Sequence, residues 1–258
     1  MDLSLTGKAA IVGGASQGIG FAIARMLAAE GARVAMVARR REALDAAVAR
    51  VEGEAFAIAA DIRKADDCER IVASAVDRFG RLDILVNNDG APPLGRLDEF
   101  DDAAWAKAVE QNLMSVVRLT RKAIPHMREA GGGSIVNITA LSVLQPIARF
   151  GLSVATWAAV LGYAKTLSLE VAADKITVNT ICPGRIATGR LEAVFGAGDG
   201  KRPLDEQALR DLVKSVPLQR LGKPEEIAGL VALLASPWGA YITGSTFHID
   251  GGRHAALS

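Results

Sequence analysis

The 258-residue chain has few of the residues that build disulfide-linked or metal-bound folds. It contains 2 cysteines and 3 histidines. Neither Cys68 nor Cys182 stands at a spacing typical of a zinc site, and the histidines are too isolated to indicate another metal site. Sparse cysteine is typical of a reducing compartment. We therefore expect no metal centre, and a protein of the cytoplasm.

The chain also lacks an excess of charge of either sign and any long apolar run. Its 30 Lys and Arg residues nearly balance 29 Asp and Glu residues, and the basic residues are scattered. No run of about 18 apolar residues exists, and the N-terminus shows no charged segment followed by an apolar one. These absences predict a protein that binds neither nucleic acid nor membrane.

The chain does contain a regular alternation of short apolar runs and amphipathic segments. Half of its residues are hydrophobic, which is enough to bury a sizeable core. Apolar strands that alternate with amphipathic helices predict a parallel sheet covered on both faces. With no linker or internal repeat, we expect one α/β domain over residues 1–258, built on a Rossmann-type doubly wound sheet. The expected strands cover residues 9–12, 34–37, 55–60, 82–86, 134–138, 176–181 and 245–249.

The clearest predicted helix covers residues 68–79, where apolar residues recur with helical spacing before Gly80. A longer helix is expected over residues 101–127, with an interruption near Pro125. Residues 189–203 are rich in glycine, which favours a loop. Together with the following residues they are interpreted as a flap over 189–215 rather than as a domain boundary. Further helices are expected at residues 21–27, 41–51, 152–172 and 227–234.

A glycine-rich stretch after the first expected strand is the clearest functional motif. Its glycines fall as Gly14-x3-Gly18-x-Gly20, a relative of the G-x-G-x-x-G pattern. Glycine permits positive φ and close approach of the backbone, and the next helix offers its N–H groups and positive dipole end to a pyrophosphate. We therefore predict a dinucleotide site at this turn. Its expected contacts are Gly14, Ser16, Gln17, Gly18, Ile19 and Gly20.

The end of the second expected strand predicts which dinucleotide binds. In sites for NAD, an acidic residue about 20 positions after the glycine turn binds the 2′-hydroxyl of the ribose. This chain has Ala38 there, followed by Arg39, Arg40 and Arg41. No carboxylate would repel a 2′-phosphate and Arg39 could bind one, so we predict NADP(H) in preference to NAD(H). Arg41 and Arg40 could instead begin a solvated helix.

Asp61 and Ile62 follow the third expected strand. Ligands of parallel α/β sheets bind at the carboxyl ends of the strands. We therefore expect Asp61 to contact the adenine through its side chain and Ile62 through its backbone. Asp61 could also cap the next helix, and the two roles are compatible.

Several short motifs stand at the ends of the later strands and beyond them. They are Asn87-Asn88-x-Gly90, Asn112, Ile135-Val136-Asn137-Ile138, Pro183-Gly184-x3-Thr188, Pro217-Leu218-x-Arg220-Leu221-Gly222 and Asp250-Gly251-Gly252. With the glycine turn, they resemble the short-chain dehydrogenase/reductase family over nearly the whole chain, and its bacterial ketoacyl-carrier-protein reductases most of all. The resemblance implies a nicotinamide-dependent oxidoreductase that forms a tetramer or dimer of identical subunits. It also implies cofactor contacts at Asn88, Gly90, Pro183, Gly184, Ile186 and Thr188.

The resemblance fails at the residues that catalyse the reaction. Family members place a Tyr-x-x-x-Lys pair on the helix after the fifth strand and a serine upstream of it. The tyrosine gives a proton to the carbonyl oxygen, the lysine lowers the pKa of the tyrosine and holds the nicotinamide ribose, and the serine orients the substrate oxygen. In this chain Tyr163 and Tyr241 are followed four residues later by Leu167 and Ser245. No Tyr-x-x-x-Lys pair therefore exists.

The small residues that normally follow the pair show what stands in its place. Alignment on residues 158–162 puts Ser153 in the tyrosine slot, Trp157 in the lysine slot and Ala140 in the serine slot. Of the family's four catalytic residues, Asn112 alone is retained. Trp157 could fill the vacated space, stack on a substrate or cover the site of the nicotinamide ribose, or it could pack in a subunit contact.

We therefore predict an atypical NADP(H)-dependent oxidoreductase for a small, apolar carbonyl or alcohol substrate. Asn112 and Ser153 are its candidate catalytic residues, and the proton partner could be water, the substrate, or a hydroxyl of Thr139 or Ser142. Asp89, where the family has alanine, should weaken cofactor binding unless an arginine offsets it. A lyase or isomerase on this scaffold and an inactive cofactor-binding subunit are the alternatives. The expected pocket residues are Leu144, Phe150, Leu152, Trp157, Leu191, Val194 and Phe195.

Overall fold

A parallel sheet of seven strands forms the centre of the computed structural model, which describes residues 2–90, 92–195 and 205–256. The strand order is β3-β2-β1-β4-β5-β6-β7, and each neighbouring pair is parallel. The order reverses between β1 and β4, so the predicted doubly wound sheet is confirmed. The strands are β1 (Ala9–Val12), β2 (Arg33–Ala38), β3 (Ala55–Ala59), β4 (Ile84–Asn87), β5 (Gly133–Ile138), β6 (Ile176–Pro183) and β7 (Thr246–Ile249).

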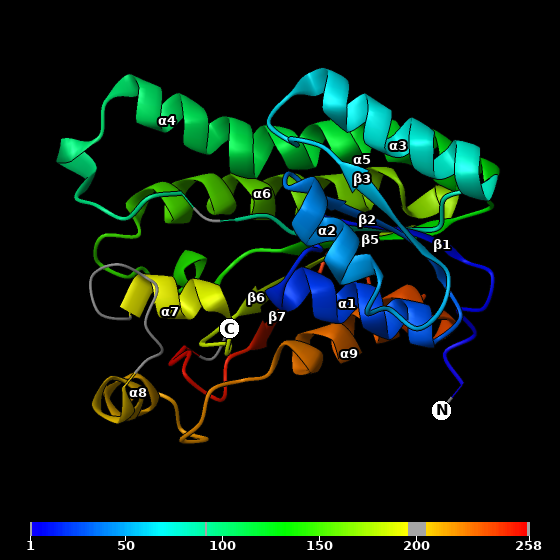
Figure 1. The fold of residues 1–258 in the computed structure, drawn as a ribbon. Helices are drawn as coiled ribbons and strands as arrows, with labels where there is room; N and C mark the ends of the chain where they lie inside the picture. Colours follow the sequence, from blue (N-terminus) through cyan, green and yellow to red (C-terminus); the bar gives the residue numbers. More distant parts are fainter. Residues whose placement is uncertain (1, 91, 196–204, 257–258) are drawn as a thin grey trace.

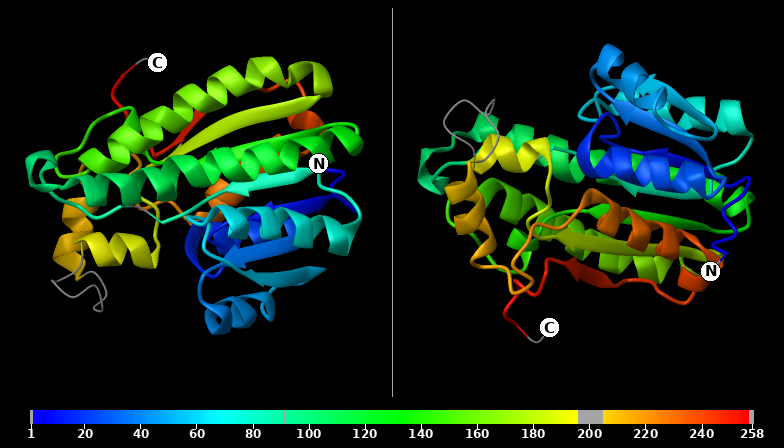
Figure 2. Two further views of the ribbon diagram at one scale, coloured as in Figure 1. Left: turned by 90° about the horizontal axis from the view of Figure 1, so that it is seen from above. Right: turned by 60° about the horizontal axis from the view of Figure 1, so that its bottom comes forward.

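Helices cover both faces of the sheet (Figures 1 and 2). On one face α1 packs against α9, with α2 beside β2 and β3; on the other face α3 packs against α5, and α6 covers β6. None of these described helices is long and apolar enough to cross a membrane. Their bounds are α1 (Gly18–Ala29), α2 (Arg41–Val48), α3 (Ala65–Phe79), α4 (Asp102–Val109), α5 (Ser115–Glu129), α6 (Gly151–Glu170) and α9 (Pro224–Ala235).

Two apolar layers hold these helices to the sheet, because successive strand residues point to opposite faces. In β1, Ala10 and Val12 pack in the layer of α1 and α9, whereas Ala9 and Ile11 pack in the layer of α3 and α5. All four side chains are buried. Burial on both faces explains why the central strands are continuous apolar runs in the sequence.

The long helix predicted over residues 101–127 is interrupted at a different place from the one expected. Pro125 lies inside α5, and the interruption is a π-helical turn, Glu110–Met114, between α4 and α5. A proline inside a helix costs about 3 kcal/mol, and the buried side chains on either side of Pro125 offset that cost by packing on the sheet. The π turn inserts a residue into the helix, and it carries Asn112 into the interior.

The glycine-rich segment predicted as a loop contains a helix, α7 (Gly189–Phe195). Its first turn begins where the carbonyl of Thr188 accepts the N–H of Leu191 at 2.9 Å, and the Leu191 side chain is buried. That buried anchor stabilises a turn that glycine alone would disfavour. A further helix, α8 (Glu206–Val213), belongs to the predicted flap. The rest of the predicted loop, residues 196–203, lies outside the described residues.

Candidate cofactor and substrate cavity

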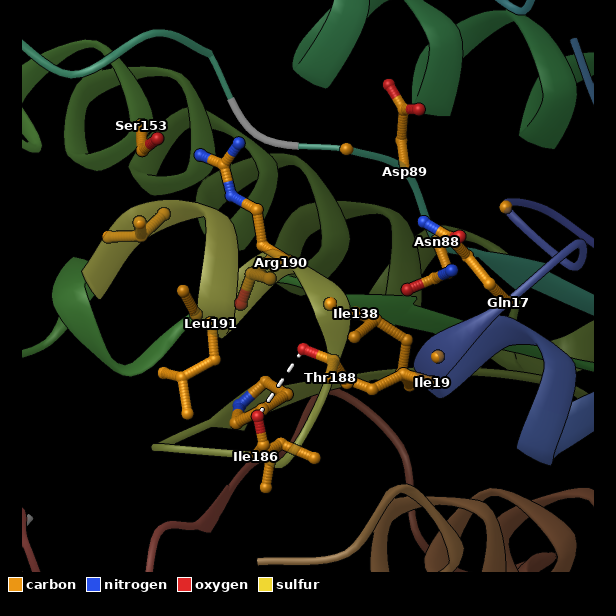
Figure 3. A pocket seen from close by; sticks show the side chains of 18 of the residues that line it. Gln17, Ile19, Asn88, Asp89, Ile138, Ser153, Ile186, Thr188, Arg190 and Leu191 are labelled. Atoms are coloured by element: carbon orange, nitrogen blue, oxygen red, sulfur yellow. Dashed lines mark hydrogen bonds between the residues drawn. The ribbon is translucent and has the colours of Figure 1, made fainter. Parts of the chain in front are cut away.

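The carboxyl ends of strands β1 to β6 surround a cavity of about 860 Å³, and α7 forms part of its wall (Figure 3). Parallel strands bring their carboxyl ends to one edge of a sheet, so residues distant in sequence meet there. Except for Gly20, every predicted cofactor residue lines this cavity. These lining residues are Gly14, Ser16, Gln17, Gly18, Ile19, Arg39, Asp61, Ile62, Asn88, Gly90, Pro183, Gly184, Ile186 and Thr188.

Gly20 shapes the glycine turn instead of lining the cavity. A Cβ at this position would stand 2.4 Å from the carbonyl oxygen of Gly14 and 2.7 Å from Nδ2 of Asn88. Asn88 ties the turn to the end of β4, because its Nδ2 donates to the carbonyl of Gly13 at 3.0 Å. Gly14 and Gly18 have φ values of 59° and 58°, in the left-handed region that favours glycine. The turn leads into α1, whose first N–H groups have no side-chain cap and can bind a phosphate.

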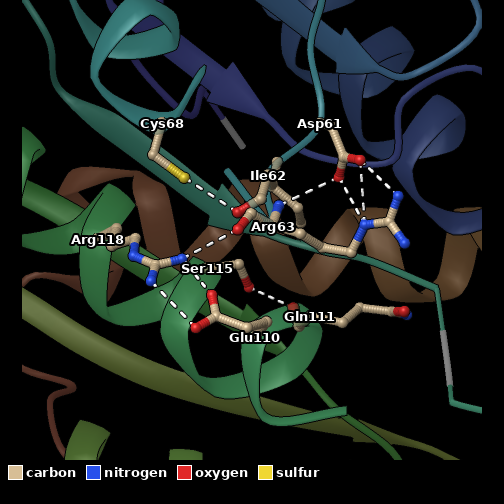
Figure 4. A network of polar contacts seen from close by, with 8 residues as sticks. All are labelled: Asp61, Ile62, Arg63, Cys68, Glu110, Gln111, Ser115 and Arg118. Carbon is tan, nitrogen blue, oxygen red and sulfur yellow. Dashed lines mark hydrogen bonds and ion pairs between the residues drawn. The ribbon is translucent and has the colours of Figure 1, made fainter. Parts of the chain in front are cut away.

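Arg39, Asp61 and Arg63 lie at one end of the cavity, which we call the adenosine end because the expected 2′-phosphate and adenine contacts are there. Arg63 donates from Nε to Oδ1 of Asp61 at 2.8 Å (Figure 4). This bond lowers the pKa of the Asp61 carboxyl, and Asp61 stays charged at neutral pH. The capping role considered for Asp61 is wrong, because Lys64 is the N-cap residue of α3 and provides no side-chain cap. The sequence offered no signal for Arg63 as its partner.

A polar network fixes the segment at the end of β3 to the π turn (Figure 4). Arg118 donates to the carbonyl of Arg63 at 3.1 Å and pairs with Glu110 in the π turn. On the same segment, the carbonyl of Ile62 accepts from Sγ of Cys68 at 3.1 Å. The backbone at Ile62 is therefore held rigidly against the cavity wall.

Asp89 adds a second carboxyl group to the adenosine end. Its Oδ2 is buried and has no hydrogen-bond partner in the described chain. Burial raises the pKa of Asp89 to about 6, an effect that the positive charges of Arg39 and Arg63 oppose and the negative charge of Asp61 reinforces. Asp89 therefore lies within the electrostatic reach of Arg39, the residue predicted to bind the 2′-phosphate.

The opposite end of the cavity, which we call the substrate end, is formed by residues 138–157, α7 and Arg253. The hydroxyl groups of Ser142 and Ser153 are buried there, with 2% and 1% of each residue exposed, and neither has a partner among the described residues. Thr139 differs, because its Oγ1 lies 3.3 Å from the carbonyl of Ile181 and is satisfied. Of the hydroxyls considered from the sequence, Ser142 and Ser153 are thus the pair available to a ligand.

Trp157 occupies the wall between this end and the interior. It is 9% exposed and forms an apolar cluster with Val116 and Val160, against which Ala140 also packs. The indole is therefore packed within its own subunit. No lysine, tyrosine or histidine is present among the described residues that line the cavity.

Asn112 lies away from the lining of the main cavity, in the π turn. It is 2% exposed, and its Nδ2 donates to Oγ1 of Thr156 at 2.8 Å. Thr156 is on α6, one helical turn after Leu152, and Leu152 precedes Ser153 in the chain. The structure therefore brings Asn112 to the helix that carries Ser153, without contact between Asn112 and the main cavity.

Three arginines, Arg185, Arg190 and Arg253, line the cavity outside the adenosine end. Arg190 donates to the carbonyl of Pro92 at 3.3 Å, and Arg185 lies over the Phe195 ring at 5.5 Å. Burial lowers the pKa of Arg185 and Arg190. No pattern in the sequence indicated that these arginines would line the cavity.

Most of the apolar residues predicted for the pocket do line the cavity. They are Phe150, Trp157, Leu191, Val194 and Phe195, whereas Leu144 and Leu152 do not line it.

Comparison with known proteins gives matches over nearly the whole chain. A family model described as enoyl-(acyl carrier protein) reductase matches residues 14–254. The dehydrogenase/reductase SDR family member 4 of Oryctolagus cuniculus is 35% identical, over 98% of this chain and 96% of that protein. A 3-oxoacyl-[acyl-carrier-protein] reductase of Vibrio cholerae is 36% identical, over 98% of this chain and 99% of that protein.

Solved structures agree with these matches. L-sorbose reductase from Gluconobacter frateurii, in a complex with NADPH and L-sorbose, superposes with a TM-score of 0.91 at 33% identity and full coverage of both chains. A short-chain alcohol dehydrogenase from Sinorhizobium meliloti, so described provisionally, superposes with a TM-score of 0.89 at 35% identity over 98% of each chain.

Proposed function

The chain belongs to the short-chain dehydrogenase/reductase family of oxidoreductases, and we propose that it uses NADP(H) to interconvert a small carbonyl compound and its alcohol without the family's Ser–Tyr–Lys set. One observation carries the proposal. Apart from Gly20, the residues expected to hold the dinucleotide line one cavity, whereas the three acid–base slots at its other end contain Ala140, Ser153 and Trp157.

The cavity residues fit a dinucleotide phosphate. The glycine turn leaves no room for a Cβ at Gly20 and directs the uncapped start of α1 toward the cavity. Arg39 follows β2 and is exposed, and its guanidinium is the group best suited to a 2′-phosphate. L-sorbose reductase, which shares this fold, binds NADPH. These points support NADP(H) over NAD(H).

Ser142 and Ser153 are the residues that would orient the substrate. When bound, NADPH supplies the hydride for the carbonyl carbon. The two serine hydroxyls, which have no hydrogen-bond partner within the described ranges, can donate hydrogen bonds to the carbonyl oxygen and stabilise the negative charge that develops on it. A serine is a very weak acid, so the proton for this oxygen comes from water in the cavity. Loss of a positioned general acid slows such reactions by about 10²–10⁴-fold, so we expect slow turnover.

Trp157 would exclude water from the inner wall. Its indole, packed with Val116 and Val160, closes the side where the family has a lysine. The low polarity of this wall strengthens the hydrogen bonds from the serines to the developing charge. Trp157 therefore contributes by shape and by desolvation.

Two measurements test the proposal. The first is a fluorescence titration with NADPH and NADH, for which we expect NADPH to bind about tenfold or more tightly because of Arg39. The second is consumption of NADPH with a panel of ketones, aldehydes and 2-oxo acids, which we expect to be abolished in the Ser142→Ala/Ser153→Ala variant. Failure to bind either cofactor would contradict the proposal. Conversion of a substrate with no change in NADPH absorbance would favour a lyase or isomerase.

A further inference from the structure

Positive charge at the substrate end of the cavity has no acidic counterpart among the described residues that line it. The described acidic residues that line the cavity are Asp61 and Asp89, and both belong to the adenosine end. Arg185, Arg190 and Arg253 line the rest of the cavity, and none of them forms an ion pair with a carboxylate in the described ranges. Guanidinium groups that have no carboxylate partner in the described part of the chain, beside apolar walls, attract an anion.

Arg190 is held in one direction. Its side chain extends from α7 toward the first turns of α6, where Ser153 lies (Figure 3). One guanidinium nitrogen donates to the carbonyl of Pro92 at 3.3 Å. The segment after Pro92 is joined to the start of α6, because Gly95 donates to the carbonyl of Arg149 at 3.0 Å. The guanidinium is therefore held near the N-terminus of α6, and its other donors have no partner among the residues that the structure describes.

The first turn of α6 is itself uncapped. The helix runs for 20 residues from Gly151, and its N-cap residue Phe150 offers no side-chain acceptor to the N–H groups that follow. A helix start of this kind favours a negative group. Ser153, the third residue of the helix, adds a second and independent sign of a ligand: the residue is 1% exposed, and its hydroxyl has no partner in the described chain. Phe150, Ser153 and Arg190 line the same cavity.

We infer that the substrate end binds a carboxylate of the substrate between the Arg190 guanidinium and the first turn of α6, so that the preferred substrates are small 2-oxo or 3-oxo acids. This inference rests on the proposed function. The planar guanidinium matches a carboxylate with two parallel hydrogen bonds. Serine in the tyrosine slot leaves space for the carboxylate beside helix α6. Arg185 and Arg253 add positive potential, and Leu191, Val194 and Phe195 offer an apolar wall to the rest of the molecule.

A matched pair of probes tests the inference by binding alone. Benzoylformate carries an aromatic ring, a carbonyl and a carboxylate, and methyl benzoylformate is its neutral ester. Each is titrated calorimetrically into the protein saturated with NADP⁺, so that no turnover occurs. We expect the acid to bind about tenfold or more tightly than the ester, which is typical of hydrogen bonds to a charged group.

Variants distinguish a specific contact of Arg190 with the carboxylate from a general effect of positive charge. Arg190→Gln should bring the acid and the ester to similar affinities, and Arg190→Lys should keep part of the difference. Arg210→Gln is the matched control, because Arg210 on α8 faces solvent, pairs with Glu206 and carries the same charge; this variant should keep the full difference. When the ligand is the acid, the single O–H of Ser153 donates to the carboxylate and Ser142 keeps the hydrogen bond to the carbonyl oxygen. Ser153→Ala should therefore weaken the acid more than the ester, which supports the inference even if Arg190→Gln is unstable.

Three outcomes would overturn the inference. Equal affinity of the wild type for acid and ester would do so, and so would an unchanged preference for the acid in Arg190→Gln. Tighter binding of phenyl phosphate than of benzoylformate would show that the site prefers a phosphate group to a carboxylate. Failure of NADP⁺ to saturate the protein would instead count against the proposed function, and the two failures are therefore distinguishable.

Discussion

Asn112 donates a hydrogen bond from its Nδ2 to Oγ1 of Thr156 at 2.8 Å, across the contact between the π turn and α6. Thr156 in turn donates to the carbonyl of Leu152 at 2.7 Å. Leu152 is the neighbour of Ser153, so this chain of bonds fixes the helical turn that presents the Ser153 hydroxyl. We therefore expect Asn112 to be a positioning residue that acts through α6.

Thr156→Val should disturb both stability and turnover. The substitution leaves Asn112 buried without a partner for its amide, which lowers the free energy of unfolding by about 1–3 kcal/mol. We expect kcat to fall more than KM changes, because Ser153 loses its orientation. Chemical denaturation and steady-state kinetics measure the two effects. Thr156→Ser keeps the hydroxyl and should restore both; an inactive Thr156→Ser would contradict the positioning role.

Gly20→Ala should damage the glycine turn. The added Cβ would stand 2.4 Å from the carbonyl oxygen of Gly14, and such overpacking costs about 1–3 kcal/mol. We expect a lower melting temperature and weaker NADPH binding. Gly229→Ala is the matched control, because Gly229 is exposed on α9 and its Cβ would meet no atom within 4 Å. That control should stabilise the protein by about 0.5–1 kcal/mol. Equal effects of the two changes would be inconsistent with a tight turn.

Arg39→Ala should remove the preference for NADPH. The guanidinium of Arg39 would bind the 2′-phosphate that NADH lacks, so its loss weakens NADPH binding about tenfold or more and leaves NADH unchanged. Arg41→Ala provides the comparison, because Arg41 pairs with Asp45 on the exposed face of α2. Fluorescence titration of both cofactors checks the result. An equal loss of NADH affinity in Arg39→Ala would show a structural role for Arg39.

Asp89→Asn should stabilise the protein at alkaline pH. Burial raises the pKa of Asp89 from 3.8 to about 6, so the folded state takes up a proton more readily than the unfolded state. The free energy of unfolding of the wild type therefore falls as pH rises through this interval, and Asn removes that loss. We expect the variant to be more stable than the wild type at pH 8 and similar to it at pH 4. A constant difference across this range would contradict the assignment.

The same substitution should change how cofactor binding depends on pH. Above the pKa of Asp89, its negative charge opposes the attraction of Arg39 and Arg63 for a 2′-phosphate, and Asp61 adds to that opposition. The wild type should therefore bind NADPH less tightly than Asp89→Asn at pH 8, with a smaller difference at pH 5. The phosphate of the cofactor also titrates near pH 6, so the comparison between the two proteins at each pH is the informative quantity.

The sequence predicted the parts of the fold that rest on local patterns. The helix α3 is one example: Ile71, Val72 and Ala75 are buried as their spacing predicts, and the helix ends at Gly80, whose φ is 74°. The glycine turn is another example, because the spacing of its glycines and their position after an apolar strand are sufficient to predict a turn between a strand and a helix. Strand ends then place most of the expected cofactor residues at one edge of the sheet.

Features that depend on distant partners could not be predicted in this way. Pro125 favoured a break by its own chemistry, yet packing on the sheet keeps α5 continuous. Asp61 has a side chain suited to capping a helix, but its carboxylate accepts a hydrogen bond from Arg63 instead. Arg190 is an ordinary arginine in the sequence, and its significance arises when α7 and α6 meet at one cavity.

Transfer of deuterium from cofactor to product tests the central claim most directly. The protein is incubated with NADPH that carries deuterium at the transferable position of nicotinamide C4 and with benzoylformate as well as the neutral ketones and aldehydes of the panel. We predict an alcohol product one mass unit heavier than that formed with ordinary NADPH, with one equivalent of NADP⁺ for each alcohol. Tight binding of NADPH without any deuterated product from the panel would contradict hydride transfer by this protein.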